Sequence, residues 1–212
     1  MKFMEKNTLL KILKVKNYSD LFAEIISFVL NPVVILIPLP GYLIYETTGV
    51  ISQIILWSLI SFIFIFLFFI FIATGVRLKY FSDFDISKRK QRPTLYFFAI
   101  FLVCLFIISL FYLQAPKIIF IATFALTAGL IIFQVVNFFI KASAHVATIT
   151  VFVTSMIVIH KEPLYLLGYV PVLLVSWSRI KLKKHTPLEA AVGGILGVIL
   201  SIIVYMMGKQ FV

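Results

Sequence analysis

Three short polar segments of this 212-residue chain carry side chains that suit work on a phosphate group. The segments are 85–93, 141–145 and 178–189, and each lies between long apolar runs. Their candidate residues are Lys88, Arg89, Arg92, Ser143, His145, Ser178, Arg179, His185 and Glu189. Basic side chains together with two of the chain's three histidines suit phosphoryl transfer.

The chemistry follows from the residue types. A guanidinium group holds phosphoryl oxygens with paired, charge-assisted hydrogen bonds, which a lysine cannot do. One imidazole can attack phosphorus, and a second can protonate the departing oxygen, because imidazole exchanges a proton near neutral pH. Two histidines with two arginines therefore suffice for hydrolysis without a metal.

The composition places these segments in a membrane protein. Hydrophobic residues make up 62% of the chain and charged residues 13%, whereas a soluble domain has about a quarter charged residues. The mean hydropathy is +1.13. The net charge of +11 lies in short stretches between apolar runs, so it predicts membrane topology and not nucleic-acid binding. Cys104 has no partner, so no disulfide is expected.

Continuous apolar runs, as opposed to alternating ones, predict an all-α polytopic transmembrane bundle. The runs are 21–45, 50–76, 95–113, 118–140, 146–159, 164–177 and 187–207. Seven spans result, or six if the first run does not cross, because Asn31, Pro32, Pro38 and Pro40 break it. We expect residues 1–20 to form a basic cytoplasmic tail and residues 21–212 a single transmembrane domain.

The parity of the spans brings the three segments to one membrane face. Two spans separate the first segment from the second, and two more separate the second from the third. Sixteen of the 19 basic residues then lie on that face, which the positive-inside rule assigns to the cytoplasm. Cations that take part in catalysis are weak evidence for topology, so this assignment rests on the five lysines of the tail, provided that the first run spans.

The pattern Arg92-Pro93, Ser143-x-His145 and Ser178-Arg179-x5-His185 resembles the three-part signature of the type 2 phosphatidic acid phosphatase (PAP2) superfamily. The resemblance covers roughly residues 85–200, and its third part is the most specific. It implies metal-independent hydrolysis of phosphate monoesters or diphosphates, usually on lipids, with no cofactor. Known members commonly work on the outer or lumenal face, so the face of the site stays open.

The resemblance also implies a role for each matched residue. His185 would be the nucleophile and His145 the acid for the leaving group, while Arg92, Ser143 and Arg179 would hold the phosphoryl oxygens. The family's lysine ahead of the first arginine falls on Asp85 here, so Lys88 or Arg89 is expected to substitute for it. Ala144 replaces the family's glycine, and Glu189 replaces its aspartate.

Several of these features also have a purely structural explanation. Thr186-Pro187-Leu188-Glu189 fits a capping box with proline at the first helical position, so Glu189 is a candidate for capping, for orienting His185, or for both. Gly193, Gly194 and Gly197 predict close helix packing. Trp57 and Trp177 fit interfacial anchors.

Two other functions compete with a phosphatase. Asp83 and Asp85 ahead of Arg92 resemble one acidic loop of the UbiA-type prenyltransferases, which hold diphosphate through magnesium, but the second acidic loop is missing. A non-enzymatic lipid-binding or transport protein with a cationic pocket is the other. For the phosphatase we expect a phosphorylated lipid as partner, either a polyprenyl diphosphate or a phosphatidate-like monoester, in a cell membrane.

Overall fold

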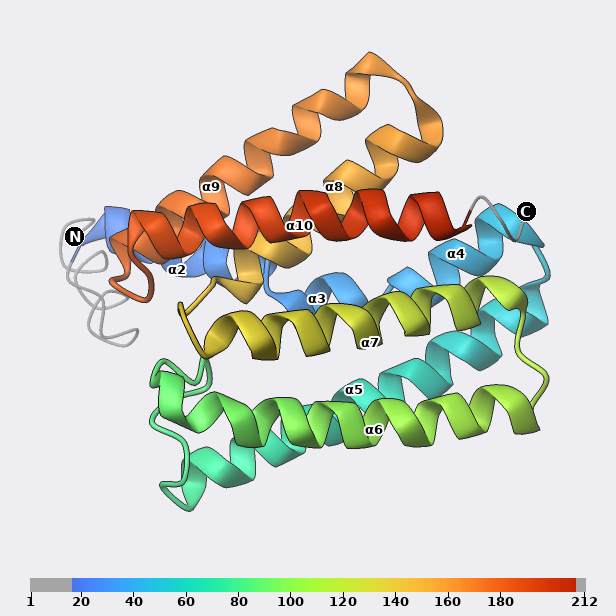
Figure 1. Ribbon diagram of the computed structural model, residues 1–212, viewed down its shortest axis with the longest axis horizontal. Coiled ribbons are helices and arrows are strands. Elements are labelled where there is room, and N and C mark those ends of the chain that lie inside the picture. The colour runs from blue at the N-terminus through green and yellow to red at the C-terminus, as the bar shows by residue number, and fades with distance from the viewer. Residues whose placement is uncertain (1–16, 209–212) are drawn as a thin grey trace, which may run out of the picture. The chain divides into compact units, whose positions relative to one another are not determined.

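The computed structural model describes residues 17–208, and every regular element in that range is helical (Figure 1). The predicted tail through residue 16 and Lys209 lie outside the described residues. In chain order the elements are α2 Tyr18–Val29, α3 Pro32–Leu36, α4 Leu39–Thr47, α5 Ile51–Arg77, η1 Arg89–Gln91, α6 Arg92–Tyr112, α7 Lys117–Asn137, α8 Ala144–His160, η2 Pro163–Gly168, α9 Tyr169–Lys181 and α10 Pro187–Gly208.

Six helical stretches in this range are long and apolar enough to cross a membrane. They are Tyr18–Leu36, Ile51–Arg77, Arg89–Tyr112, Lys117–Asn137, Pro163–Lys181 and Pro187–Met206. The 17-residue helix α8 is apolar but shorter. The prediction of an all-helical, multi-pass membrane protein is confirmed, and the predicted runs match the observed helices to within a few residues.

The first predicted run is broken, as its prolines indicated. Helix α2 ends at Val29, and α3 begins at Pro32, whose ring nitrogen has no hydrogen to continue the helical hydrogen bonding. A second break follows α3, and α4 begins at Leu39 with Pro38 as its N-cap. Asn31 lies in the first break, and its Oδ1 accepts a hydrogen bond from the Val33 N–H at 2.9 Å.

The described residues form two compact units. We call residues 17–34 and 142–205 the first unit, and residues 35–141 and 206–208 the second unit. In the first unit α8 and α9 form a helical hairpin, while α2 packs against α9 (Figure 1). In the second unit α4, α5, α6 and α7 pack on one another.

The core of the second unit lies where its four helices meet. Ile44, Trp57, Leu110 and Ile119 are buried there, one from each helix. The indole Nε1 of Trp57 donates to Gln53 Oε1 at 2.9 Å, which satisfies its polar atom one helical turn away. The prediction of Trp57 as an interfacial anchor is wrong, because the ring is fully buried in this core.

Small residues on α10 let it pack closely on α8 in the first unit. A Cβ atom on Gly193 would lie 2.5 Å from the Ser143 carbonyl oxygen, and one on Gly197 would lie 2.7 Å from the Ala147 carbonyl oxygen. One turn further, the Ser201 hydroxyl donates to the Val151 carbonyl at 3.0 Å. The predicted packing role is confirmed for both glycines, since no larger residue fits against this backbone.

Candidate functional site

Three helix ends come together in the first unit, and they carry most of the predicted site. They are the start of α8, the end of α9 and the start of α10. The backbone N–H of Ser143 donates to the Glu189 carbonyl at 3.1 Å, which joins the start of α8 to the first turn of α10. The predicted meeting of the second and third polar segments is confirmed within this unit.

The loop from α9 to α10 folds tightly back on Arg179. The Arg179 carbonyl accepts hydrogen bonds from the N–H groups of Lys184 and His185, at 3.0 and 3.2 Å. Lys183 adopts a left-handed conformation with a φ of 55°, which reverses the chain at this point. The residues between Arg179 and His185 thus form the C-terminal cap of α9. The hydrogen bond across this cap holds the backbone of His185 next to that of Arg179.

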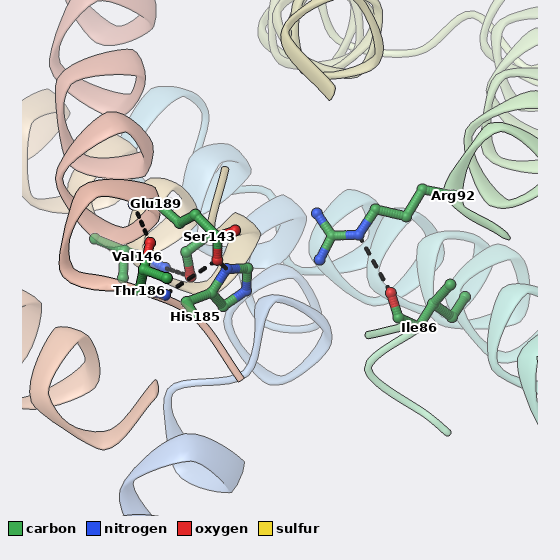
Figure 2. A network of polar contacts seen from close by, with 7 residues as sticks. All are labelled: Ile86, Arg92, Ser143, Val146, His185, Thr186 and Glu189. Carbon is green, nitrogen blue, oxygen red and sulfur yellow. Dashed lines mark hydrogen bonds and ion pairs between the residues drawn. The ribbon is translucent and has the colours of Figure 1, made fainter. Parts of the chain in front are cut away.

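Glu189 is shared between the helix cap and His185. Its Oε2 lies 3.0 Å from His185 Nδ1 and accepts a hydrogen bond from the Thr186 N–H at 3.1 Å (Figure 2). The Glu189 N–H in turn donates to Thr186 Oγ1 at 3.2 Å. The predicted capping box is thus confirmed, and the same carboxylate also contacts the histidine.

This contact determines the chemistry open to His185. A carboxylate accepts hydrogen bonds, so it favours a proton on Nδ1. The neutral ring then carries its lone pair on Nε2, the nitrogen that could attack an electrophile. The side chain of His185 is buried, with 7% of the residue exposed.

Arg179 and Ser178 are buried at the end of α9, and both contact α2. The Ser178 hydroxyl donates to the Ala23 carbonyl at 2.7 Å. Nη1 of Arg179 donates to the Ser27 hydroxyl oxygen at 2.6 Å, and only 2% of Arg179 is exposed. The guanidinium is thus held in a fixed orientation among the first-unit helices.

Ser143 and His145 lie at the start of α8. The Ser143 hydroxyl caps the helix by accepting from the Val146 N–H at 3.5 Å, and the residue is fully buried (Figure 2). Nε2 of His145 lies 3.2 Å from Nδ2 of Asn31, and 8% of His145 is exposed. Ser143 thus serves as the N-cap of α8, and His145 is anchored by Asn31.

The basic residues of the first polar segment belong to the second unit. Arg92 is buried at the start of α6, and its Nε donates to the Ile86 carbonyl at 3.2 Å (Figure 2). Nη1 of Arg89 donates to the Phe139 carbonyl at 3.1 Å, and Lys88 is exposed. The expectation that these residues join the two histidines stays a prediction.

The loop that precedes Arg92 is organised by Asp83. Its carboxylate accepts from the Asp85 N–H at 3.0 Å and from the Ser87 hydroxyl at 2.9 Å. Ile86 adopts a φ of 47°, which a β-branched residue rarely does, and in this conformation its carbonyl meets Arg92. Asp83 is thus used to shape the loop that presents Arg92.

Metal-ligating side chains do not gather in groups of three or more anywhere in residues 17–208. The magnesium-dependent alternative would place its metal on Asp83 and Asp85, and Asp83 is already bonded to its own loop.

Two residues of the site were not anticipated from the sequence. Ser27 contacts Arg179, and Asn31 contacts His145, yet both lie outside the segment that carries the PAP2 resemblance. One signal was present, because a polar Asn-Pro step inside an otherwise apolar run marks a helix break lined with side-chain polar atoms. Ser27 gave no signal, since a single serine in an apolar helix is common.

No family model, no curated protein and no solved structure matches this chain.

Proposed function

We propose that this protein is a membrane phosphatase that hydrolyses a lipid-linked phosphate monoester or diphosphate through a phosphohistidine. The observation that carries the proposal is the 3.0 Å pair of His185 Nδ1 and Glu189 Oε2 in the first unit, which also holds the buried Arg179 and His145. An oriented imidazole next to fixed guanidinium donors suits attack on phosphorus. The resemblance to the PAP2 signature, in order and spacing, supports the same chemistry.

In the first half of the proposed reaction, Nε2 of His185 attacks phosphorus and forms an N–P bond. The bond between phosphorus and the lipid oxygen breaks, and His145 in its imidazolium form gives that oxygen a proton. Glu189 stabilises the positive charge that develops on the His185 ring, because its carboxylate lies against Nδ1. The lipid alcohol, or the lipid monophosphate when the substrate is a diphosphate, leaves.

In the second half, water attacks the phosphohistidine. His145, now neutral, takes a proton from the water as its oxygen bonds to phosphorus. The N–P bond breaks, His185 recovers its lone pair on Nε2, and inorganic phosphate is released. His145 keeps the proton that it took from water and is again an imidazolium, so the site is ready for another substrate.

Two helix N-termini add positive potential where the phosphate would bind. Helix α8 begins at Ala144 and α10 begins at Pro187, and the Ser143–Glu189 backbone hydrogen bond holds these two ends together. Helix N-termini attract anions through their dipoles. Together with Arg179 they would hold the phosphoryl oxygens and the charge that spreads over them in the transition state.

An apolar groove in the first unit supports a lipid substrate. The groove has a volume of about 330 Å³ and lies on α8, α9 and α10, the helices that carry the site. Its lining residues are Thr150, Tyr169, Val172, Gly194, Ile195, Val198 and Ile199. Thr150 and Gly194 lie about one and a half turns beyond His145 and Glu189 on their helices, so an acyl or prenyl chain could run inward from the phosphate.

The test is phosphate release by purified protein from a panel of polyprenyl diphosphate, phosphatidate and phosphatidylglycerophosphate. His185→Ala should lower release from the preferred substrate by at least about a thousandfold, because it removes the nucleophile. His160→Ala is the matched control, since that third histidine ends α8 and stacks on Tyr165 at 4.8 Å. Release by His185→Ala at the wild-type rate would reject the nucleophile.

Trapping the intermediate separates this mechanism from its rivals. Brief incubation with a substrate labelled in its phosphate should leave acid-labile label on the wild-type protein and none on His185→Ala. A transport protein would bind the lipid and release no phosphate, even as wild type. A magnesium-dependent prenyltransferase would release diphosphate only in the presence of the metal and a second substrate.

A further inference from the structure

Helix α2 and the break after it present a stripe of residues to the site in the first unit. Residues three or four apart in a helix share one face. The stripe consists of Asp20, Ala23, Ser27 and Asn31. Asp20 contacts Lys181, and Ala23 contacts Ser178. Ser27 contacts Arg179, and Asn31 contacts His145. A segment far from the site in sequence therefore lies along it.

The contact of Ser27 with Arg179 fixes the orientation of a guanidinium. Both residues are buried, and the donor-acceptor distance of 2.6 Å is that of a strong, charge-assisted hydrogen bond. A guanidinium is planar and rigid, so a bond that holds one N–H restricts the directions in which its other N–H groups can point. Ser27 therefore controls the direction in which Arg179 can offer hydrogen bonds to a phosphate.

The contact of Asn31 with His145 fixes a proton position. Oδ1 of Asn31 accepts from the Val33 N–H, so the amide cannot be turned over without losing that bond. Its Nδ2, which can only donate, therefore faces Nε2 of His145 at 3.2 Å. The neutral His145 ring must accept at Nε2 and carry its proton on Nδ1.

We propose that Ser27 and Asn31 are positioning residues of the site: Ser27 aims Arg179 at the phosphate, and Asn31 holds His145 in its Nδ1–H form. The roles of Arg179 and His145 in this inference rest on the proposed function. A neutral ring is the form that the second half-reaction needs, because there His145 takes a proton from water. Protonation of Nε2 to give the acid form of the first half-reaction displaces the Asn31 donor, so Asn31 favours the neutral ring that is present once the lipid has left.

Binding of inorganic phosphate to purified protein in lipid nanodiscs tests Ser27 without any turnover. Ser27→Ala should weaken binding about tenfold, because Arg179 loses the contact that orients it. Ser27→Thr keeps the hydroxyl and should bind within about twofold of wild type. Ser176→Ala is the matched control, because the Ser176 hydroxyl donates to the Val172 carbonyl of its own helix. Wild-type affinity in a folded Ser27→Ala protein would overturn the role of Ser27.

Nitrogen NMR of protein labelled in its three histidines tests Asn31 on the wild-type chain itself. At a pH where the rings are neutral, His145 should carry its proton on Nδ1, with its signals assigned by their loss in His145→Gln. Asn31→Asp keeps an oxygen to cap Val33 but replaces the donor with an acceptor, so the proton should move to Nε2. An Nε2–H ring in wild type, or an unchanged ring in Asn31→Asp, would overturn the role of Asn31.

Turnover then separates this inference from the proposed function. If wild type releases phosphate, Asn31→Asp should lower kcat about tenfold with little change in KM, whereas Ser27→Ala should mainly raise KM. Wild-type kinetics in both variants would reject the positioning roles and leave the phosphatase intact. If wild type releases no phosphate from any lipid of the panel, the phosphatase fails, and the phosphate-binding and NMR measurements still decide whether Ser27 and Asn31 position Arg179 and His145.

Discussion

The carboxylate of Glu189 holds the His185 ring while it also closes the first turn of α10. Its Oε2 lies 3.0 Å from His185 Nδ1 and 3.1 Å from the Thr186 nitrogen. One oxygen atom thus couples the start of a transmembrane helix to the proposed nucleophile. A change at Glu189 should therefore affect both stability and turnover, and suitable variants can separate the two effects.

Glu189→Gln should separate capping from catalysis. Glutamine is a normal partner in a capping box, so the helix start should stay intact. The neutral amide cannot stabilise a positively charged His185 ring as a carboxylate does, so phosphate release should fall about a hundredfold. Glu189→Ala should lose release as well, and about 1 kcal/mol of stability through the lost cap.

Thermal melting in detergent and phosphate release measure the two effects of these variants. Glu189→Asp provides a further comparison, because it keeps the carboxylate on a shorter side chain, the one that the PAP2 signature has at the matching position. Equal loss of melting temperature in Glu189→Gln and Glu189→Ala would show that the charge itself stabilises the helix start, contrary to the argument above.

Gly193→Ala and Gly197→Ala should each destabilise the protein by about 1–3 kcal/mol, because a methyl group has no space against the α8 backbone. Gly194→Ala is the matched control on the same helix. A Cβ there would lie 3.8 Å from the Val146 side chain, which is ordinary contact. The melting temperature should fall most in Gly193→Ala, less in Gly197→Ala and least in Gly194→Ala. A large loss in Gly194→Ala would contradict the packing argument.

Local patterns in the sequence were enough to predict the helices and much of the first unit. Proline positions predicted the break after α2, and the Thr186–Glu189 spacing predicted the capping box of α10. Span parity predicted that all three polar segments emerge on one side; the Ser143–Glu189 hydrogen bond joins the second and third, and the place of the first stays a prediction. These features depend on short-range geometry or on counting, and both can be read from one sequence.

Contacts between distant helices could not be predicted in this way. The bonds of Ser27 to Arg179 and of Asn31 to His145 depend on how α2 is rotated and shifted against its neighbours. Trp57 shows the same limit, because an indole near a helix end suits the membrane interface and a buried core equally well. The packing of neighbouring large side chains decides between interface and core, and the hydropathy pattern does not show which side chains pack together.

Arg92→Lys should lower phosphate release about tenfold or more if Arg92 holds phosphoryl oxygens as the PAP2 resemblance implies, since lysine cannot replace a two-pronged donor. Arg77→Lys is the control, because Arg77 is exposed at the end of α5. The melting temperature reports the loss of the hydrogen bond from Arg92 to Ile86 separately. Wild-type release by a folded Arg92→Lys protein would remove Arg92 from the proposed site.

Removal of divalent cations should leave phosphate release unchanged. The proposed reaction uses Arg179, two helix N-termini and two histidines to balance the phosphate charge, and none of these needs a metal. Release should therefore be the same after exhaustive chelation and after adding back magnesium.

Activity that disappears with chelation and returns only with magnesium would instead favour the prenyltransferase alternative and its acidic loop. In that case Asp83→Asn should abolish activity, whereas under the phosphatase mechanism it should mainly loosen the loop that presents Arg92 and lower the melting temperature.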